Sequence, residues 1–310
     1  MYKIGIDLGG TNIAVGITDE NYRILCTATT PTCPEKGAAG IVDDMLLSIN
    51  NALTLSGISM GECRGIGLGS PGTCDSENGV VRNAHNLHWK SVPVCAMLKE
   101  RTGLNAYVSN DANCAALGEL VAGAAKGCES ALMITLGTGV GGGYVVGNQI
   151  LSGHKTLGGE FGHICIQMDG EPCSCGEKGC WEAYASATAL IRQAEKAAKE
   201  HPESALSAML PLDGKKIHDA ALAGDQAAQD VIAAYAKYVA VGLVGYINCL
   251  YPETVLLGGG IAGMGELLFA PIRAYVKEHF FVRDETLMPV IKAAMLGNAA
   301  GIIGAAALVP

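Results

Sequence analysis

The chain opens with short apolar runs separated by glycine-rich or polar turns. Three runs rich in β-forming residues occupy Tyr2–Asp7, Ile13–Thr18 and Arg23–Thr30. The turns between them read Gly-Gly-Thr-Asn and Asp-Glu-Asn. Because apolar runs joined by such short turns are typical of hairpins, the pattern predicts an antiparallel meander of three strands.

Beyond residue 40 the spacing of the apolar residues changes. Ile41, Met45, Ile49 and Leu53 recur at every fourth position, which predicts a helix from Ile41 to Leu55. Other apolar runs predict three short strands and four more helices. The strands are Gly65–Gly69, Ala106–Ser109 and Thr254–Leu257, and the helices are Ala112–Ala125, Ser186–Glu200, Ile217–Leu250 and Gly297–Leu308.

The opening pattern recurs later in the chain. Residues 4–17 and 133–146 each contain an apolar run, a turn rich in glycine and threonine, and a second apolar run. Two such hairpins predict two related domains that face each other across a cleft. We expect the boundary near Ala112, with a small first domain over residues 1–112 and a larger second domain over residues 113–296.

Composition narrows the class of protein. The chain has 310 residues, 49% of them apolar, and a net charge of −9 without any run of Lys or Arg. That balance argues against a nucleic-acid partner. Asp7 stands where a signal peptide would carry its apolar region, and runs such as Tyr238–Ile247 are shorter than the ~20 residues of a membrane span. We therefore expect a soluble cytoplasmic protein without a membrane partner.

Three glycine-rich turns follow predicted strands and are candidate phosphate sites. In the first, Gly9 and Gly10 can take positive φ, Thr11 and Asn12 add side-chain donors, and Asp7 can hold Mg²⁺ through water. A plain β-turn is the alternative for this motif. The second turn carries Thr138 and Gly139, and the third is Gly258, Gly259 and Gly260. Neither matches the P-loop pattern. Three such turns fit one nucleotide held by two domains.

Two polar segments suggest further chemistry. Asn110 and Asp111 stand between a predicted strand and a predicted helix, where helix capping is the simpler interpretation. As a functional residue, Asp111 would be a general base that accepts a proton from a hydroxyl. The segment Asn83–Trp89 contains two amides, two imidazoles and an indole, which suits a sugar, although an ordinary loop is the alternative.

A cysteine cluster is the most specific signal. Cys173, Cys175 and Cys180 fall within eight residues, and His163 lies upstream. Three thiolates and one imidazole are a typical ligand set for tetrahedral zinc, and the intervening glycines let the loop turn back on itself. Glu160 and Glu182 flank the cluster, with surface solvation as their alternative. The other nine cysteines show no such spacing and are interpreted as small buried hydrophobes.

These motifs together resemble the ROK family (repressors, open reading frames and sugar kinases), and the resemblance runs from end to end. The carrying segments are Asp7–Asn12, Ser109–Asn113, Leu136–Gly143, Gly159–His163 and Cys173–Glu182. The resemblance implies an α/β protein with a two-domain, actin-like and hexokinase-like (ribonuclease H-like) ATPase fold and a central cleft. It also implies that the helix at about residues 297–310 completes the first domain, and that a homodimer is common.

The resemblance implies roles by position. Asp111 would be the base on a sugar 6-hydroxyl, and the sugar hydroxyls would be held by Asn86, Asn110, Glu160, His163 and Glu182. His163 would also ligate zinc with Cys173, Cys175 and Cys180. Gly9–Asn12 and Thr138–Gly139 would face the phosphates of ATP, and Gly258–Gly260 the adenosine. The expected cofactors are ATP, Mg²⁺ and structural zinc.

The expected reaction is ATP-dependent phosphorylation of a hexose, with glucose as the substrate the motifs favour. Kinases for N-acetylmannosamine, N-acetylglucosamine, fructose or allose remain alternatives on the same scaffold. A sugar-sensing regulator is a third possibility, but family repressors bind DNA through an added N-terminal segment, and this chain is acidic and opens directly on the first strand.

Overall fold

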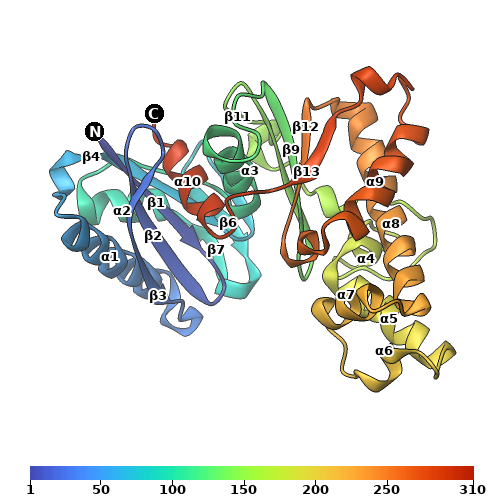
Figure 1. Ribbon diagram of the computed structural model, residues 1–310. Helices are drawn as coiled ribbons and strands as arrows, with labels where there is room; N and C mark the ends of the chain where they lie inside the picture. Colours follow the sequence, from blue (N-terminus) through green and yellow to red (C-terminus); the bar gives the residue numbers. More distant parts are fainter. The chain divides into compact units, whose positions relative to one another are not determined.

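The computed structural model describes residues 1–310 and divides into two compact units (Figure 1). The first unit comprises Met1–Met133, Gly143–Gly159 and Met295–Pro310, and the second comprises Ile134–Gly142 and Glu160–Ala294. The residues after Ala112, where the sequence placed the boundary, still belong to the first unit. The last residues of the chain also belong to it.

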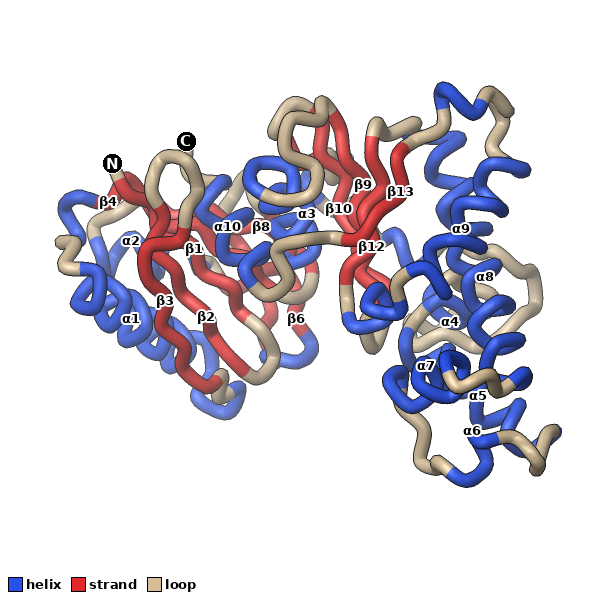
Figure 2. Tube along the Cα trace, viewed as in Figure 1, coloured by secondary structure: helices blue, strands red, loops and turns tan.

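A five-stranded sheet forms the centre of the first unit (Figure 2). Its strand order is β3-β2-β1-β4-β8, with β1–β3 antiparallel as the meander predicted and β4 and β8 parallel to β1. The strands are β1 Tyr2–Leu8, β2 Asn12–Thr18, β3 Ile24–Pro31, β4 Cys63–Ser70 and β8 Ala106–Asn110. Helix α1 (Gly37–Ser56) packs on β2 and β3 and buries the predicted stripe of Ile41, Met45 and Ile49.

Helices α3 (Asp111–Ala122) and α10 (Ala299–Ala307) pack against each other and on this sheet with almost no side chains between them. A Cβ atom at Gly67 of β4 would lie 1.7 Å from the carbonyl oxygen of Ala305, and one at Gly304 would lie 1.6 Å from that of Cys114. Only glycine permits backbones to approach so closely. The small-residue character of the last helix therefore reflects tight packing inside the first unit.

The first unit also contains a small three-stranded sheet, which was not predicted. It consists of β5 Thr73–Asp75, β6 Val80–Ala84 and β7 Trp89–Val92, and it is followed by helix α2 Val94–Thr102. Trp89 is only 2% exposed and belongs to the core. The expectation that the amides of Asn83–Trp89 together with an aromatic ring suit a sugar loses its aromatic part, because the pleat of β7 turns the Trp89 ring inward. The segment is also not an ordinary loop, since it spans the end of β6, a 3-10 turn and the start of β7.

The other five-stranded sheet of the chain, called the second sheet below, has the order β11-β10-β9-β12-β13, with β12 and β13 parallel. The hairpin predicted over residues 133–146 is formed by β9 and β10. The division between the units falls within both strands, after Met133 in β9 and after Gly142 in β10. The strands are β9 Ser130–Leu136, β10 Val140–Val146, β11 Gln149–Ile150, β12 Thr254–Gly258 and β13 Val290–Ala293.

Helices make up most of the remaining second unit. The α-helices are α4 Glu182–Ala185, α5 Ala187–Glu200, α6 Ala205–Ala208, α7 Gly214–Leu222, α8 Gln226–Leu250 and α9 Glu266–His279. Short 3-10 turns complete the chain at Pro34–Lys36, Met60–Glu62, His85–Leu87, His154–Thr156, Phe161–His163, Gly260–Met264 and Glu285–Leu287.

The helix predicted over Ile217–Leu250 is two helices. Gly224 adopts φ 92°, and the Asp225 side chain caps α8 by accepting a hydrogen bond from the Ala228 N–H. By length and composition α8 is the one helix that could cross a membrane, contrary to the expectation that apolar runs are too short. Half of its most apolar window is buried inside the protein, where α8 packs on α5 and α9, as in the core helix of a soluble protein.

Candidate active site

Two carboxylates meet at one edge of the first unit's large sheet. Asp7 pairs with Gly69 in the register of β1 and β4, and Gly69 pairs with Ser109 in the register of β4 and β8. Asp111, two residues after Ser109, begins helix α3. A Cβ at Gly69 would lie 3.3 Å from the Cys114 Sγ and 3.6 Å from the Asp111 Cα, so the start of α3 packs closely on the strand between the two acids.

The environment of Asp7 favours its protonated form. Burial, and then the negative charge of Asp111, raise the pKa of Asp7 from 3.8 to about 6. Helix α10 closes over the same carboxyl group, since a Cβ at Gly301 would lie 2.6 Å from the Asp7 Cγ. Asp7 is thus a confined carboxylate whose charge a nearby cation would stabilise.

Asn110 fixes the start of α3. Its Oδ1 accepts hydrogen bonds from the Ala112 and Asn113 N–H groups at 3.0 and 3.4 Å, and its Nδ2 donates to the Gly72 carbonyl at 3.0 Å. The capping interpretation of this residue is confirmed. The Asp111 Oδ1 accepts a further hydrogen bond from the Ala112 N–H at 2.8 Å. These contacts hold the Asp111 carboxylate at the helix terminus.

The turn Gly9–Asn12 differs from the expectation in its conformation. Neither Gly9 nor Gly10 has positive φ. The Gly9 N–H donates to the Asn12 carbonyl at 2.9 Å and so extends the hairpin between β1 and β2. The lack of a side chain at Gly10 serves packing and not a positive φ, because a Cβ there would lie 3.0 Å from the Asn86 Nδ2. The structure thus brings Asn86 next to the first glycine-rich turn.

In the second unit, Glu182 joins the second glycine-rich turn to the cysteine loop. Its Oε2 accepts a hydrogen bond from the Val140 N–H at 3.0 Å, and its Oε1 accepts one from the Ser174 hydroxyl at 2.8 Å. A Cβ at Gly139 would lie 2.4 Å from that Oε2. The surface interpretation of Glu182 is wrong, because its carboxylate connects two loops.

The third glycine-rich turn lies beside the second. A Cβ at Gly259, which has φ 86°, would lie 2.4 Å from the Leu136 carbonyl oxygen at the end of β9. The carbonyl of Thr138 accepts a hydrogen bond from the Thr188 hydroxyl at 2.9 Å. Gly258–Gly260 and Thr138–Gly139 therefore share one edge of the second sheet.

The cysteine loop brings its four predicted ligands together. One donor atom from each of His163, Cys173, Cys175 and Cys180 lies within 4.8 Å of all the others. The Sγ atoms of Cys175 and Cys180 are 3.7 Å apart, and the His163 Nδ1 is 3.6 Å from the Cys173 Sγ. Tetrahedral zinc with Zn–S bonds of about 2.3 Å requires separations of about 3.8 Å, so this set fits zinc.

The local electrostatics of the cluster are uneven. A hydrogen bond from the Glu177 backbone lowers the pKa of the Cys175 thiol, whereas burial raises that of Cys180 to about 12. The His163 Nδ1 faces Cys173, which leaves Nε2 on the opposite side of the ring. Glu160 immediately precedes the 3-10 turn that carries His163, and its carbonyl accepts the His163 N–H at 3.1 Å.

Known proteins resemble this chain along nearly its whole length. The family model described as "ROK family" matches residues 3–310. The chain belongs to the ROK family. A glucokinase of Streptomyces coelicolor is 38% identical over 316 residues, covering 98% of this chain and 96% of the relative. A glucokinase of Thermotoga maritima is 38% identical over 312 residues, covering 99% and 96%.

Solved structures agree with this assignment. A ROK family glucokinase from Streptomyces griseus, in complex with glucose and AMPPNP, is 36% identical with a TM-score of 0.81 and covers 100% of this chain and 99% of that one. The expected two-domain hexokinase-like fold is confirmed. Sequence and structure together assign this ROK protein to the ATP-dependent hexose kinases.

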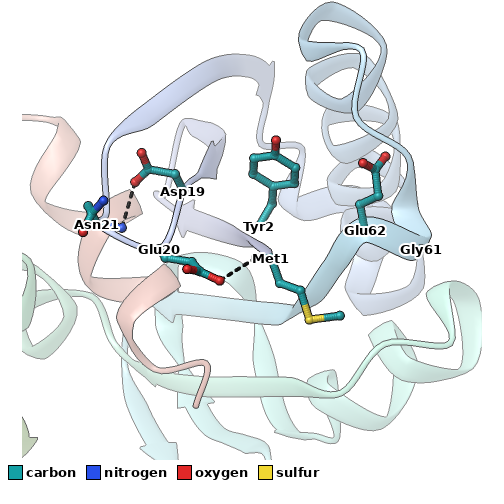
Figure 3. Close-up of a pocket in the computed structure, with 7 residues that line it drawn as sticks. All are labelled: Met1, Tyr2, Asp19, Glu20, Asn21, Gly61 and Glu62. Carbon is teal, nitrogen blue, oxygen red and sulfur yellow. Dashed lines mark hydrogen bonds and ion pairs between the residues drawn. The ribbon is translucent and has the colours of Figure 1, made fainter.

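A separate cavity of 560 Å³ lies at the amino-terminal edge of the first unit, lined by Met1, Tyr2, Asp19, Glu20, Asn21, Gly61 and Glu62 (Figure 3). Its carboxylates already have partners within the fold. Glu20 binds the terminal ammonium group, Asp19 accepts the Asn21 N–H at 2.9 Å, and Glu62 accepts the Ser59 N–H at 2.9 Å. The cavity therefore shares no residue with the motifs of this ROK protein.

Three contacts were not predicted from the sequence. Ser174 holds Glu182, Thr188 holds the Thr138 carbonyl, and Gly301 makes room for Asp7. A hydroxyl between two metal-ligand cysteines was a usable signal for Ser174. The position of Gly301 depends on long-range packing, for which the local sequence carries no signal.

Proposed function

We propose that this protein transfers the γ-phosphoryl group of ATP to the 6-hydroxyl of glucose, with Asp111 as the general base. The observation that carries the proposal is the presence of Asp7 and Asp111 at the same end of one sheet, near enough for the charge of Asp111 to raise the pKa of Asp7, in a chain whose 38%-identical relatives are glucokinases. Two carboxylates of unequal environment can divide two tasks between them.

Asp111 would take the hydroxyl proton as the sugar oxygen attacks the γ-phosphorus and ADP departs. The hydrogen bond from the Ala112 N–H to Oδ1 helps to orient the carboxylate. Asp7 would hold Mg²⁺, whose positive charge offsets the charge on the phosphates. Asn86 and Asn110 would bind sugar hydroxyls from the same unit, close to Gly9–Asn12, which would face the phosphates.

The second unit would contribute sugar contacts from Glu160, His163 and Glu182. Zinc, when bound, would supply a fixed point for the imidazole ring and no catalysis. With Nδ1 directed to the metal, Nε2 would meet a sugar hydroxyl. Thr138 and Gly139 would face the phosphates, and Gly258–Gly260 the adenosine. We also expect a cytoplasmic homodimer.

The proposal is tested by an assay of ADP release with Mg²⁺-ATP on glucose, N-acetylmannosamine, N-acetylglucosamine, fructose, mannose and allose. We expect the highest kcat/KM on glucose. A higher value on another hexose would transfer the assignment to that sugar. Absence of turnover on every sugar, from zinc-loaded protein, would contradict a kinase and favour a sugar-sensing protein.

A further inference from the structure

Cys165 and Cys180 are direct partners across an antiparallel bridge in the second unit. The bridge is flanked by two backbone hydrogen bonds, from Ile166 N–H to Gly179 O at 2.9 Å and from Trp181 N–H to Ile164 O at 2.8 Å. This pattern makes the two cysteines a non-hydrogen-bonded pair, for which Cα atoms lie about 4.5 Å apart and side chains share a face. Disulfides span Cα separations of about 4.4–6.8 Å, so the pair lies within reach of a covalent link.

The two thiols differ in solvent exposure and in whether they belong to the candidate metal site. Cys180 is 2% exposed and belongs to the four-residue metal cluster, whereas Cys165 is exposed and lies outside that cluster. The Cys165 Sγ lies 3.9 Å from the Lys178 carbonyl oxygen, against the segment that leads into Cys180. A rotation about the Cα–Cβ bond is the motion that redirects this sulfur toward its partner.

The cysteines outside the metal loop differ in how accessible they are to an oxidant. Cys63, Cys74 and Cys114 are buried, so an oxidant in solution does not reach them as it reaches the exposed Cys165. Cys249 is exposed but lies on α8, away from the metal loop in sequence. The expectation that all nine remaining cysteines are buried hydrophobes is confirmed for Cys63, Cys74 and Cys114 and is wrong for the exposed Cys165 and Cys249, whereas Cys26, Cys33, Cys95 and Cys128 are half-buried.

We propose that Cys165 and Cys180 form an oxidation site that releases the metal of the loop. A hydroperoxide oxidises the Cys165 thiol to a sulfenic acid and is itself reduced, hydrogen peroxide giving water. The Cys180 sulfur then attacks the Cys165 sulfur, forming the disulfide and expelling the sulfenic oxygen as a second water. A metal held by the loop would keep His163, Cys173 and Cys175 and would lose Cys180 as its fourth protein ligand.

This assignment does not depend on the sugar that the protein phosphorylates. It follows from the bridge geometry, the exposure of Cys165 and the membership of Cys180 in the cluster. The loss of one ligand leaves an open position on the metal, which changes a closed structural site into one that exchanges its ion. A thiol reductant reverses the link and restores the ligand set.

The test treats zinc-loaded full-length protein with hydrogen peroxide and compares it with Cys165→Ser, using Cys249→Ser as the matched exposed-cysteine control. Peptide mapping under non-reducing conditions should find the segments containing Cys165 and Cys180 joined, lighter by two hydrogen atoms than the separate peptides. A chromogenic chelator should detect zinc release from the wild type and from Cys249→Ser. Cys165→Ser should lose the linked peptide and release zinc more slowly, and dithiothreitol should reverse the link.

Two results would overturn the proposal. One is a map in which the first disulfide joins only Cys173, Cys175 and Cys180 among themselves. The other is equal zinc release from Cys165→Ser and the wild type. Circular dichroism and zinc content before oxidation establish that each variant is folded and loaded, so failure to fold is not mistaken for either result.

Discussion

The two units hold their functional residues by different physical means. In the first, Asp7 and Asp111 are placed by strands in register and by helices that touch the sheet backbone to backbone. In the second, residues 160–181 form one short 3-10 turn and two isolated bridges, and the four candidate metal ligands come together there beside Glu182. Packing between regular elements fixes the residues of the first unit, and metal coordination would fix those of the second.

This difference predicts different sensitivities. Residues placed by main-chain packing should tolerate metal removal but not an added methyl group at the contact. Residues placed by coordination should be displaced when the metal is removed. Five changes to the protein separate these behaviours.

Asp111→Asn should have the largest effect on activity. The amide preserves the size and place of the side chain but cannot accept the hydroxyl proton, so kcat should fall about 10²- to 10⁴-fold. Sugar affinity measured by calorimetry should stay close to that of the wild type. Asp43→Asn, an exposed change that removes only a surface contact with Arg101, is the control. An active Asp111→Asn protein would remove Asp111 from the base role.

Cys175→Ser should release zinc and destabilise the second unit. A bound metal at a thousandfold excess over its Kd stabilises a fold by about 4 kcal/mol, and this contribution should be lost. Metal analysis and hydrogen exchange by region measure the two effects, with Cys249→Ser as control. Protection of α1 and α3 in the first unit should not change. Wild-type protein that contains no zinc when purified without chelator would contradict the metal assignment.

Gly67→Ala should destabilise the first unit without affecting zinc content. The added Cβ would lie 1.7 Å from the Ala305 carbonyl oxygen, so α10 must move away from the sheet. Overpacking of this kind costs about 3 kcal/mol, readable from urea unfolding. Gly61→Ala adds the same methyl group where no atom lies within 4 Å and should be nearly neutral. Equal stability of the two variants would disprove the packing argument.

Asp7 should make stability depend on pH. Its pKa is about 6 in the fold against 3.8 for the ordinary group, so the fold binds the proton more tightly than the unfolded chain. Its contribution is therefore full below about pH 4 and lost as the pH rises through 6, a change of about 2–3 kcal/mol. Urea unfolding of wild type and Asp7→Asn without Mg²⁺ or nucleotide checks this. Parallel pH profiles for both proteins would refute it.

Ser174→Ala should have the smallest effect. It removes one hydrogen bond to the Glu182 carboxylate, and because Ser174 is exposed we expect a rise in the sugar KM of about 3- to 10-fold. The kcat and the zinc content should stay near wild-type values. Ser174→Thr keeps the hydroxyl and should restore the KM. An unchanged KM in Ser174→Ala would show that this contact does not position Glu182.

Local patterns in the sequence predicted the strands and turns near the site, and cysteine spacing predicted the metal cluster. Strands β1–β3 follow runs whose apolar residues and turns lie next to one another in the chain. The four ligands also converge as predicted, because three of them share one short loop. Both features depend on contacts within a few residues.

Features that depend on distant contacts were missed. The approach of Asp7 to Asp111 requires the strand order β1-β4-β8, which no local run specifies. The sheet β5-β6-β7 was not predicted because β6 contains Arg82 and Asn83 among its apolar residues. Helix α9 was missed in a segment that carries Pro271, a residue that normally argues against a helix interior.

The last helix, α10, also determines when the first unit can complete its folding. Helix α10 packs on β1, and the Lys3 Nζ donates to the Val309 carbonyl at 2.6 Å, across 306 positions of the chain. Contacts of such long range form late and slow the folding of a domain. During synthesis, nearly the whole second unit must therefore emerge before α10 can cover the face of β1 and β4 that carries Gly5 and Gly67. The end of the sheet that carries Asp7 is thus synthesised long before its packing is completed.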